Sequence, residues 1–239
     1  MKLIAPALLI TLLGGNALVA GASPTTAPTA GPTPSPSSFH GHATNPYFPL
    51  DAGTVWVLRG REDGRRFRER VEVTRRTKVV VGVRTRVVRD VLRRADGSVA
   101  ERTRDWYATD DTGRVWYFGE ATATYDRSGG LIDREGSWQA GVDGAVAGTI
   151  MPAHPHATQA FRQEYRRGEA EDQAWVVRRG GTLRTPAGRF RHVVRTFEWS
   201  RLEPHVVSTK LYAPGVGQVM ERDVAGGNET FALVRVRRP

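Results

Sequence analysis

The sequence contains no cysteine in 239 residues, which excludes disulfide bonds and also excludes a lipid anchor on an N-terminal cysteine. A folded domain in this chain must therefore be stabilised by its core alone. Long apolar runs are also scarce, because the only one lies within the first 22 residues. We therefore expect no transmembrane segment in the mature chain.

The first 22 residues have the composition of a secretory signal peptide. Lys2 supplies a basic start, residues 3–13 form an apolar stretch too short to span a bilayer, and Ala20-Gly21-Ala22 offers a small-residue cleavage pattern. We predict that residues 1–22 direct export, so that the protein is secreted or lies at the cell surface. The alternative is an uncleaved N-terminal anchor.

A segment that lacks both charge and large apolar residues follows the apolar run. Residues 23–38 read SPTTAPTAGPTPSPSS, and a chain of this composition cannot bury enough surface to offset its conformational entropy. We predict a flexible Pro/Ser/Thr-rich tether over residues 23–44. A single β-rich domain is then expected over residues 45–239.

Lysine is nearly absent from an otherwise basic chain. Three of the 35 basic residues are lysines, so 32 are arginines, and the formal net charge is +10. Such a surface fits docking on a polyanion of the cell wall. The even spread of the arginines along the chain favours a bias in amino-acid usage instead, and no nucleic-acid partner is expected.

A long helical period is also missing after residue 22. Alternation of apolar and polar residues dominates from Thr54 onward, and turn signals such as Ala95-Asp96-Gly97 and residues 110–113 separate the runs. Short connections of this kind favour antiparallel neighbours. We predict an all-β (mainly β) fold, in which a strongly curved antiparallel sheet forms a half-barrel or barrel, with one long Gly/Pro-rich loop over residues 139–157.

Several stretches together resemble a known group of proteins. They are NPYFPL at 45–50 followed by GTVW at 53–56, EGSWQAGVDG at 135–144, TPAGRF at 185–190 and YAPGVG at 212–217. This set is similar to an uncharacterised family of secreted and lipoprotein-like β-rich proteins of actinobacteria, and it covers most of residues 45–237. The resemblance implies no reaction. More distantly, the expected sheet resembles the half-barrels that carry lipoproteins or lipids in cell envelopes.

We interpret the chain as an exported, non-enzymatic protein that binds or carries an apolar or amphipathic ligand at the cell envelope. Large aromatic residues in strands mostly fill cores, but those beside the glycine-rich stretch can also line a cavity. We expect the ligand inside the curved sheet, with residues 139–157 as a flexible lid. The candidate lining residues are Trp138, Trp116, Tyr117, Met151 and Phe161.

Catalysis and metal binding remain open as alternatives. A secreted hydrolase that acts on cell-wall glycan would use opposed carboxylates, for which Glu120 and Glu135 are the candidates. His154 and His156 lie close to Met151 and are candidate metal ligands. Neither spacing is diagnostic, so we assign no catalytic residue, no metal and no cofactor.

Overall fold

The computed structural model describes residues 34–239, so the predicted signal peptide and much of the predicted tether lie outside the described residues. Within residues 34–239 the chain is almost entirely strand, with one short 3-10 helix, η1 (Pro36–Ser38), and no α-helix. None of the described residues form a helix that is long and apolar enough to cross a membrane. The predicted all-β class is therefore confirmed.

Residues 34–239 contain seventeen strands. In chain order they are β1 (Val55–Glu62), β2 (Arg65–Val80), β3 (Val83–Arg94), β4 (Val99–Thr109), β5 (Val115–Tyr125), β6 (Leu131–Asp133), β7 (Trp138–Gln139), β8 (Val146–Met151), β9 (Ala160–Arg162), β10 (Glu164–Tyr165), β11 (Asp172–Arg179), β12 (Thr182–Thr185), β13 (Gly188–Arg191), β14 (Val194–Ser200), β15 (Val207–Ala213), β16 (Gly217–Ala225) and β17 (Thr230–Arg237).

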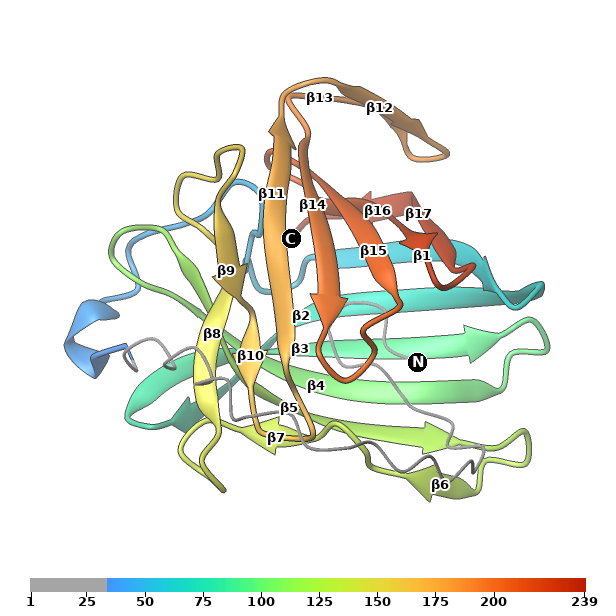
Figure 1. Cartoon of the computed structure of the whole chain (residues 1–239), viewed down its shortest axis with the longest axis horizontal. Coiled ribbons are helices and arrows are strands. Elements are labelled where there is room, and N and C mark those ends of the chain that lie inside the picture. Colours follow the sequence, from blue (N-terminus) through green and yellow to red (C-terminus); the bar gives the residue numbers. More distant parts are fainter. Residues whose placement is uncertain (1–33) are drawn as a thin grey trace, which may run out of the picture.

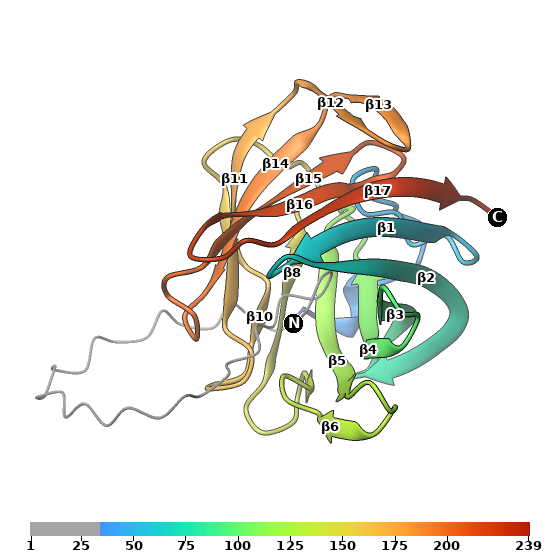
Figure 2. The same ribbon diagram turned by 90° about the vertical axis from the view of Figure 1, so that its right-hand side faces the viewer.

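Fifteen strands form one antiparallel sheet, while β12 and β13 form a separate hairpin. The main path runs β10-β8-β5-β4-β3-β2-β1-β17-β16-β15-β14-β11-β9, so the last strand of the chain pairs with the first. Figure 1 shows the long strands β2–β5 on one side and β11–β17 crossing them on the other. Strand β2 bends sharply where its pairing with β3 shifts register, and Figure 2 shows this curvature from the side. The predicted curved antiparallel sheet is therefore confirmed.

The predicted turns form as their residues require. The amide of Gly97 donates to the carbonyl of Arg94 at 2.9 Å, and Gly97 adopts a positive φ of 87° that side chains disfavour. The amide of Gly113 likewise donates to the carbonyl of Asp110 at 2.9 Å. These tight turns join β3 to β4 and β4 to β5, so neighbouring strands in the sequence are also neighbours in the sheet.

The two edges of the sheet come close enough to almost close a barrel. At one edge lie β8 and β10, and at the other lie β9 and β11. The amide of Gln163 donates to the carbonyl of Asp172 at 2.9 Å and bridges this seam. Gly148 permits the close approach, because a Cβ atom there would lie 2.2 Å from the carbonyl oxygen of Gln163. The sheet therefore encloses an interior.

The prediction of a long loop and flexible lid over residues 139–157 was wrong for much of the segment. Strand β8 lies inside this range and pairs with β5, and both Ile150 and Met151 are buried. The glycines and alanines there serve close packing against neighbouring backbone, as Gly148 shows, rather than flexibility. A flexible loop and a closely packed strand can both be rich in small residues. The composition of this stretch therefore could not distinguish a loop from a strand.

The N-terminal part of the described chain packs onto the barrel. Phe39, within the predicted tether, makes an edge contact with Phe118, with the ring centroids 5.7 Å apart. Asn45 is buried and donates from Nδ2 to the carbonyls of Gly113, at 2.8 Å, and Pro152, at 2.9 Å. The chain is therefore anchored to the barrel before the first strand begins.

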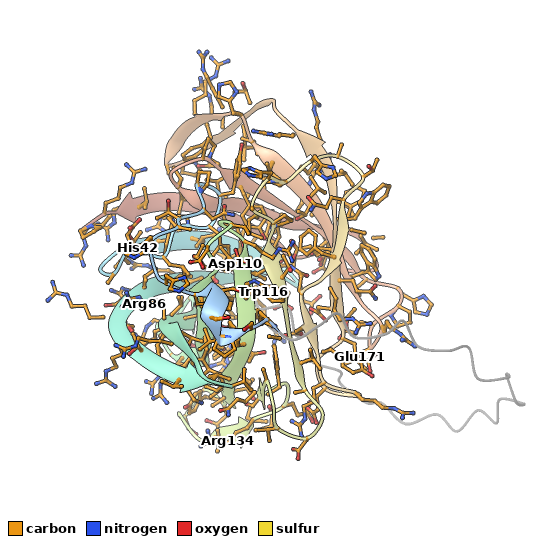
Figure 3. All side chains as sticks on the ribbon, turned by 90° about the vertical axis from the view of Figure 1, so that its left-hand side faces the viewer. His42, Arg86, Asp110, Trp116, Arg134 and Glu171 are labelled. Atoms are coloured by element: carbon orange, nitrogen blue, oxygen red, sulfur yellow. The ribbon has the colours of Figure 1, made fainter. Side chains whose placement is uncertain are left out.

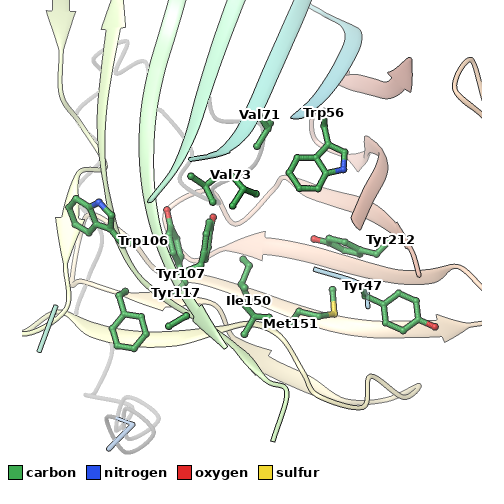
Figure 4. Packing of buried hydrophobic residues seen from close by; sticks show 14 of the residues in the cluster. Tyr47, Trp56, Val71, Val73, Trp106, Tyr107, Tyr117, Ile150, Met151 and Tyr212 are labelled. Carbon is green, nitrogen blue, oxygen red and sulfur yellow. The ribbon is translucent and has the colours of Figure 1, made fainter. Parts of the chain in front are cut away.

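One continuous core of apolar and aromatic side chains fills much of the barrel. Figure 4 shows part of this cluster, with Tyr107 and Tyr117 beside each other and Val71 and Val73 nearby. Aromatic and β-branched residues suit the pleated inner face of a curved sheet, where each side chain contacts neighbours on adjacent strands. The core thus follows from the alternating pattern.

Candidate functional site

The interior of the barrel is the candidate site, and strand register decides which residues face it. Residues directly opposite each other in an antiparallel pair share one face of the sheet. Tyr107 lies opposite Tyr117, and Asp105 lies opposite Glu120. All four side chains are buried, so the inner face of β4 and β5 combines aromatic rings with carboxyl groups.

Three aromatic rings form a continuous wall on this inner face. Tyr107 stacks on Tyr117 with 4.7 Å between the ring centroids, and Tyr117 meets Trp138 edge to face at 5.2 Å. Such geometries add to the stabilisation that burial of the rings already gives. The wall therefore holds its shape through direct ring contacts.

Carboxylates hold the polar ends of two of these rings. The hydroxyl of Tyr117 donates to Oδ1 of Asp105 at 2.9 Å, and Nε1 of Trp138 donates to Oε2 of Glu164 at 2.8 Å. Burial raises the pKa of the Tyr117 hydroxyl well above its usual value, so the group stays a donor at neutral pH. Acidic groups thus orient the aromatic wall.

A small apolar cavity of about 40 Å³ lies beside this wall. Space of this size holds a water molecule or a small group, so a larger ligand requires the lining to move. The lining residues come from the N-terminal approach, from β1–β4 and from the start of β16, and they are Phe48, Pro49, Leu50, Trp56, Leu58, Val71, Val73, Val88, Tyr107, Gly217 and Gln218.

The rest of the interior is strongly acidic. Apart from Asp110 in the turn after β4, the buried carboxyl side chains lie on strands of the barrel, and Lys210 is the sole buried Lys, Arg or His among residues 34–239. We call this group the acidic lumen. Its nine members are Glu69, Asp90, Glu101, Asp105, Glu120, Glu164, Asp172, Glu198 and Glu221.

Burial makes several of these groups hard to ionise. It raises the pKa of Asp90 to about 7, with Glu101 adding to the shift and a hydrogen bond with Glu69 opposing it. Burial, with Asp90 and Glu221, also raises the pKa of Glu69 well above its usual value. Glu69 and Asp90 lie on adjacent strands, and the charge of Asp90 adds to the effect of burial in raising the pKa of Glu69.

Lys210 sits between two carboxylates on the opposite side of the lumen. Its Nζ lies 3.1 Å from Oε2 of Glu198 and 3.5 Å from Oε1 of Glu221. Burial opposes the charge on this amine, but Glu198 and Glu221 outweigh it and hold the pKa of Lys210 well above its usual value. Tyr212 completes the cluster by donating its hydroxyl to Glu198 at 3.2 Å.

The outer surface has the opposite charge. Arg59 lies directly across from Arg68, and Arg68 lies across from Arg93, so three arginines stand side by side on β1, β2 and β3. All three are exposed. Figure 3 shows long side chains projecting outward from the barrel. Arginines therefore dominate the outer face of β1–β3, whereas the charged side chains that are buried are carboxyl groups with the exception of Lys210 among residues 34–239.

The structure places most of the predicted lining residues in or against the core, but none of the five lines the cavity described above. Trp138, Tyr117 and Met151 are buried in the core, and half-buried Phe161 on β9 packs against it. Trp116 follows the alternation to the opposite face of β5 from Tyr117. There its Nε1 donates to Oδ2 of Asp110 at 2.8 Å, and Figure 3 labels both residues.

The candidate catalytic and metal residues are not assembled into one site. Glu120 is buried on β5, whereas Glu135 is exposed in the connection between β6 and β7. His154 and His156 are both exposed. Across residues 34–239, no three His, Asp or Glu side chains are placed to hold a metal ion.

The sequence reasoning missed the acidic lumen. The signal was present, because Glu101, Asp105 and Tyr107 fall at alternate positions of one predicted strand, on the same face as residues of the core. Counting the inner and outer positions of each strand separately would have revealed these carboxylates.

No protein-family model matches the sequence, and no curated protein matches it. Two solved structures resemble the chain. One is a Bacteroides fragilis protein named as a candidate exported protein with a YmcC-like fold. Its sequence is 14% identical, the alignment covers 80% of this chain and 99% of that chain, and the TM-score is 0.47. The other is a candidate lipoprotein from Parabacteroides distasonis, 14% identical, with 82% and 100% covered and a TM-score of 0.45. These similarities are distant and assign no function to this chain.

Proposed function

We propose that the protein is exported and binds an amphipathic small molecule inside the barrel, without catalysing a reaction. The signal-peptide pattern of residues 1–22 supports export. The observation that carries the binding proposal is the interior itself, in which a wall of aromatic rings stands beside an apolar cavity and buried polar groups. Binding pockets combine apolar walls with a few convergent polar groups in this way.

Two features allow the cavity to enlarge for a ligand. The sheet is joined at its seam by few contacts, among them the hydrogen bond between Gln163 and Asp172. The cavity is also covered by Phe48, Pro49 and Leu50, which belong to the non-strand approach before β1 rather than to the sheet. Displacement of this approach opens the cavity without breaking the strand pairing that holds the barrel together.

Native mass spectrometry of the secreted protein, purified without detergent, tests the proposal. We expect a discrete adduct of small-molecule or lipid mass. Val73→Phe fills the cavity from β2 and should reduce the adduct, whereas Val79→Phe adds the same ring at an exposed site of the same strand and should not. A bare polypeptide mass in wild type and in both variants would contradict the proposal.

The arginines on the outer face favour docking on a polyanion as a second function of the same protein. Like charges directly opposite each other on neighbouring strands destabilise a sheet, yet Arg59, Arg68 and Arg93 form such a row. An anionic polymer that bridges the row would relieve this repulsion. We infer that β1–β3 form a docking face for a phosphate-rich or carboxylate-rich wall polymer.

Polyphosphate provides a probe for the docking face. The triple change Arg59, Arg68 and Arg93 to Gln should weaken binding and flatten its dependence on salt. A matched triple change to Gln at Arg178, Arg184 and Arg191 removes equal charge from exposed positions elsewhere. Equal losses in the two variants would show that net charge, and not this face, governs binding.

A further inference from the structure

The hairpin formed by β2 and β3 extends beyond the strands on either side of it. Strand β1 pairs with β2 only as far as Glu72, and β4 pairs with β3 only from Arg86 onward. Beyond these points the two strands pair only with each other among residues 34–239. We call residues 74–86 the basic tip. Figure 3 views the barrel from the side on which this tip lies and labels Arg86 at its base.

The basic tip carries positive charge and no acidic residue. It reads TRRTKVVVGVRTR, and its basic residues are Arg75, Arg76, Lys78, Arg84 and Arg86. Strand register places Arg84 directly opposite Val79. The next pair on the same face is Arg86 and Thr77. One face of the tip therefore combines arginines with an apolar side chain.

Apolar side chains at the tip are unusually exposed. Val79 is 64% exposed, which makes it the most exposed large apolar residue among residues 34–239, and Val81 is 38% exposed. Gly141 lies against Val81, because a Cβ atom there would be 2.5 Å from a methyl group of Val81. Val142, which follows Gly141, is also exposed. Single exposed apolar residues are common, but these lie together at one end of a basic hairpin.

The turn at the end of the tip contains a residue that its backbone disfavours. Val81 and Gly82 join β2 to β3, with positive φ values of 42° and 80°. Two-residue turns that need positive φ at both positions favour Asn, Asp or Gly, and a β-branched residue in this region is strained. Val81 is therefore a costly choice for folding alone. A role for an apolar side chain at this position accounts for it.

The opposite face of the tip is fixed to the barrel. Nζ of Lys78 lies 3.2 Å from the centroid of the Trp106 ring and donates to Oε1 of Gln139 at 2.7 Å. Val80 and Val83 are buried in the core. These contacts hold the tip in place, so that the face carrying Val79 points away from the barrel.

We propose that the basic tip docks on an anionic lipid surface, with Val79 and Val81 entering the interface and the arginines contacting the head groups. Charge complementarity selects an anionic partner. The exposed valines favour lipid over a soluble polyanion, because only a lipid surface also buries apolar side chains. This surface is separate from the proposed binding site in the interior, and from the row of Arg59, Arg68 and Arg93.

Cosedimentation of the mature protein with lipid vesicles tests the proposal. We expect binding to vesicles of equal parts phosphatidylglycerol and phosphatidylcholine, and not to phosphatidylcholine alone. The double change Val79→Thr and Val81→Asn should lower the affinity about tenfold, because it removes apolar surface that the lipid buries. The dependence of binding on salt should stay unchanged, since no charge is altered. Threonine suits a strand and asparagine suits the turn, so the fold should be retained.

A charge variant tests the other half of the contact. The triple change of Arg75, Arg76 and Arg84 to Gln should weaken binding about hundredfold, at about fivefold for each arginine near an anionic surface. It should also flatten the dependence of binding on salt. The two variants thus remove the apolar and the electrostatic contributions separately.

The chain offers a matched control for each variant. Ile132 on β6 is 62% exposed, so Ile132→Thr removes apolar surface from a different hairpin and should leave the affinity unchanged. The triple change of Arg59, Arg68 and Arg93 to Gln removes equal charge from the row on β1–β3 and should weaken vesicle binding less than the tip triple does. Circular dichroism checks that each variant folds, and Val79→Thr alone replaces the double variant if the latter does not.

The outcomes separate this inference from its competitors. Absence of binding to the anionic vesicles would overturn it. Vesicle binding that the valine changes leave intact, together with binding of soluble polyphosphate that the tip triple abolishes, would assign the tip to a polymer and overturn the lipid assignment. Equal losses in the two arginine triples would show that net charge governs binding, which also overturns it. A bare mass in native mass spectrometry beside valine-dependent vesicle binding would contradict the proposed function and support this inference.

Discussion

Replacing Asp90 with asparagine should stabilise the protein at alkaline pH while changing little at acidic pH. Burial raises the pKa of Asp90 from its ordinary 3.8 to about 7 in the folded state. In the unfolded state the group ionises near its ordinary value. Ionisation of Asp90 therefore lowers the free energy of the unfolded chain more than that of the folded protein. The free energy of unfolding decreases accordingly at pH values where the group is ionised in the unfolded chain.

The sign and size of the effect follow from linkage. The stability associated with protonated Asp90 is fully present below about pH 4 and is lost as the pH rises through about 7. Each pKa unit corresponds to about 1.4 kcal/mol, so the shift amounts to about 4 kcal/mol in total. Of this, about 3 kcal/mol should be lost between about pH 5 and about pH 8, since the rest is lost at lower pH.

Urea unfolding of the mature protein at these two pH values measures the effect. Wild type should lose several kcal/mol of unfolding free energy on going to the higher pH, since Glu221, with a pKa raised to about 8, contributes in the same direction. Asp90→Asn should reduce that loss by about 3 kcal/mol. Asp63→Asn, on the exposed turn before β2, is the control. An equal pH dependence in wild type and Asp90→Asn would refute the reasoning that Asp90 is buried and protonated.

Three further substitutions test the packing and the polar contacts, each by the same unfolding measurement. Gly60→Ala should cost several kcal/mol, because its Cβ would lie 2.4 Å from the ring of Phe231; a loss below about 1 kcal/mol would contradict this packing. Lys210→Met should destabilise the fold by about 3–5 kcal/mol, because it leaves the buried Glu198 without its cation. An unchanged free energy of unfolding would show that protons already neutralise Glu198 and Glu221. Trp138→Phe should cost about 1–3 kcal/mol through loss of its indole hydrogen bond, and a neutral effect would mean that water replaces the indole donor.

The fold class could be predicted because local patterns determine it here. Alternation of apolar and polar residues defines strands, and turns such as the one at Gly97 are specified by residues that tolerate a positive φ. Neighbouring strands in the sequence then pair with one another. Pairing of β17 with β1 and the approach of the two sheet edges could not be predicted, because no local residue pattern encodes contacts between segments far apart in the chain.

The site could be predicted only in part, for a related reason. Trp138, Tyr117 and Met151 are buried in the core, as large apolar residues beside a glycine-rich stretch tend to be, but none of them lines the cavity and their role in binding stays a prediction. Trp116 lies on the other face of β5 from Tyr117. Composition alone predicts that a carboxylate on a strand lies at the surface. The burial of groups such as Glu69 can be recognised only when the register of the strands is known.

The placement of acid inside and arginine outside has a physical logic that the register of β2 shows. Glu69 points into the lumen, while Arg68 and Arg70, on either side of it, belong to the outer face. A slip of one residue would reverse the two faces and bury arginines instead. A carboxyl group enters an apolar interior by keeping its proton, but a guanidinium group cannot lose its charge. The alternation of Arg and Glu therefore specifies one register, and it does so by placing inside the charged type that a proton can neutralise.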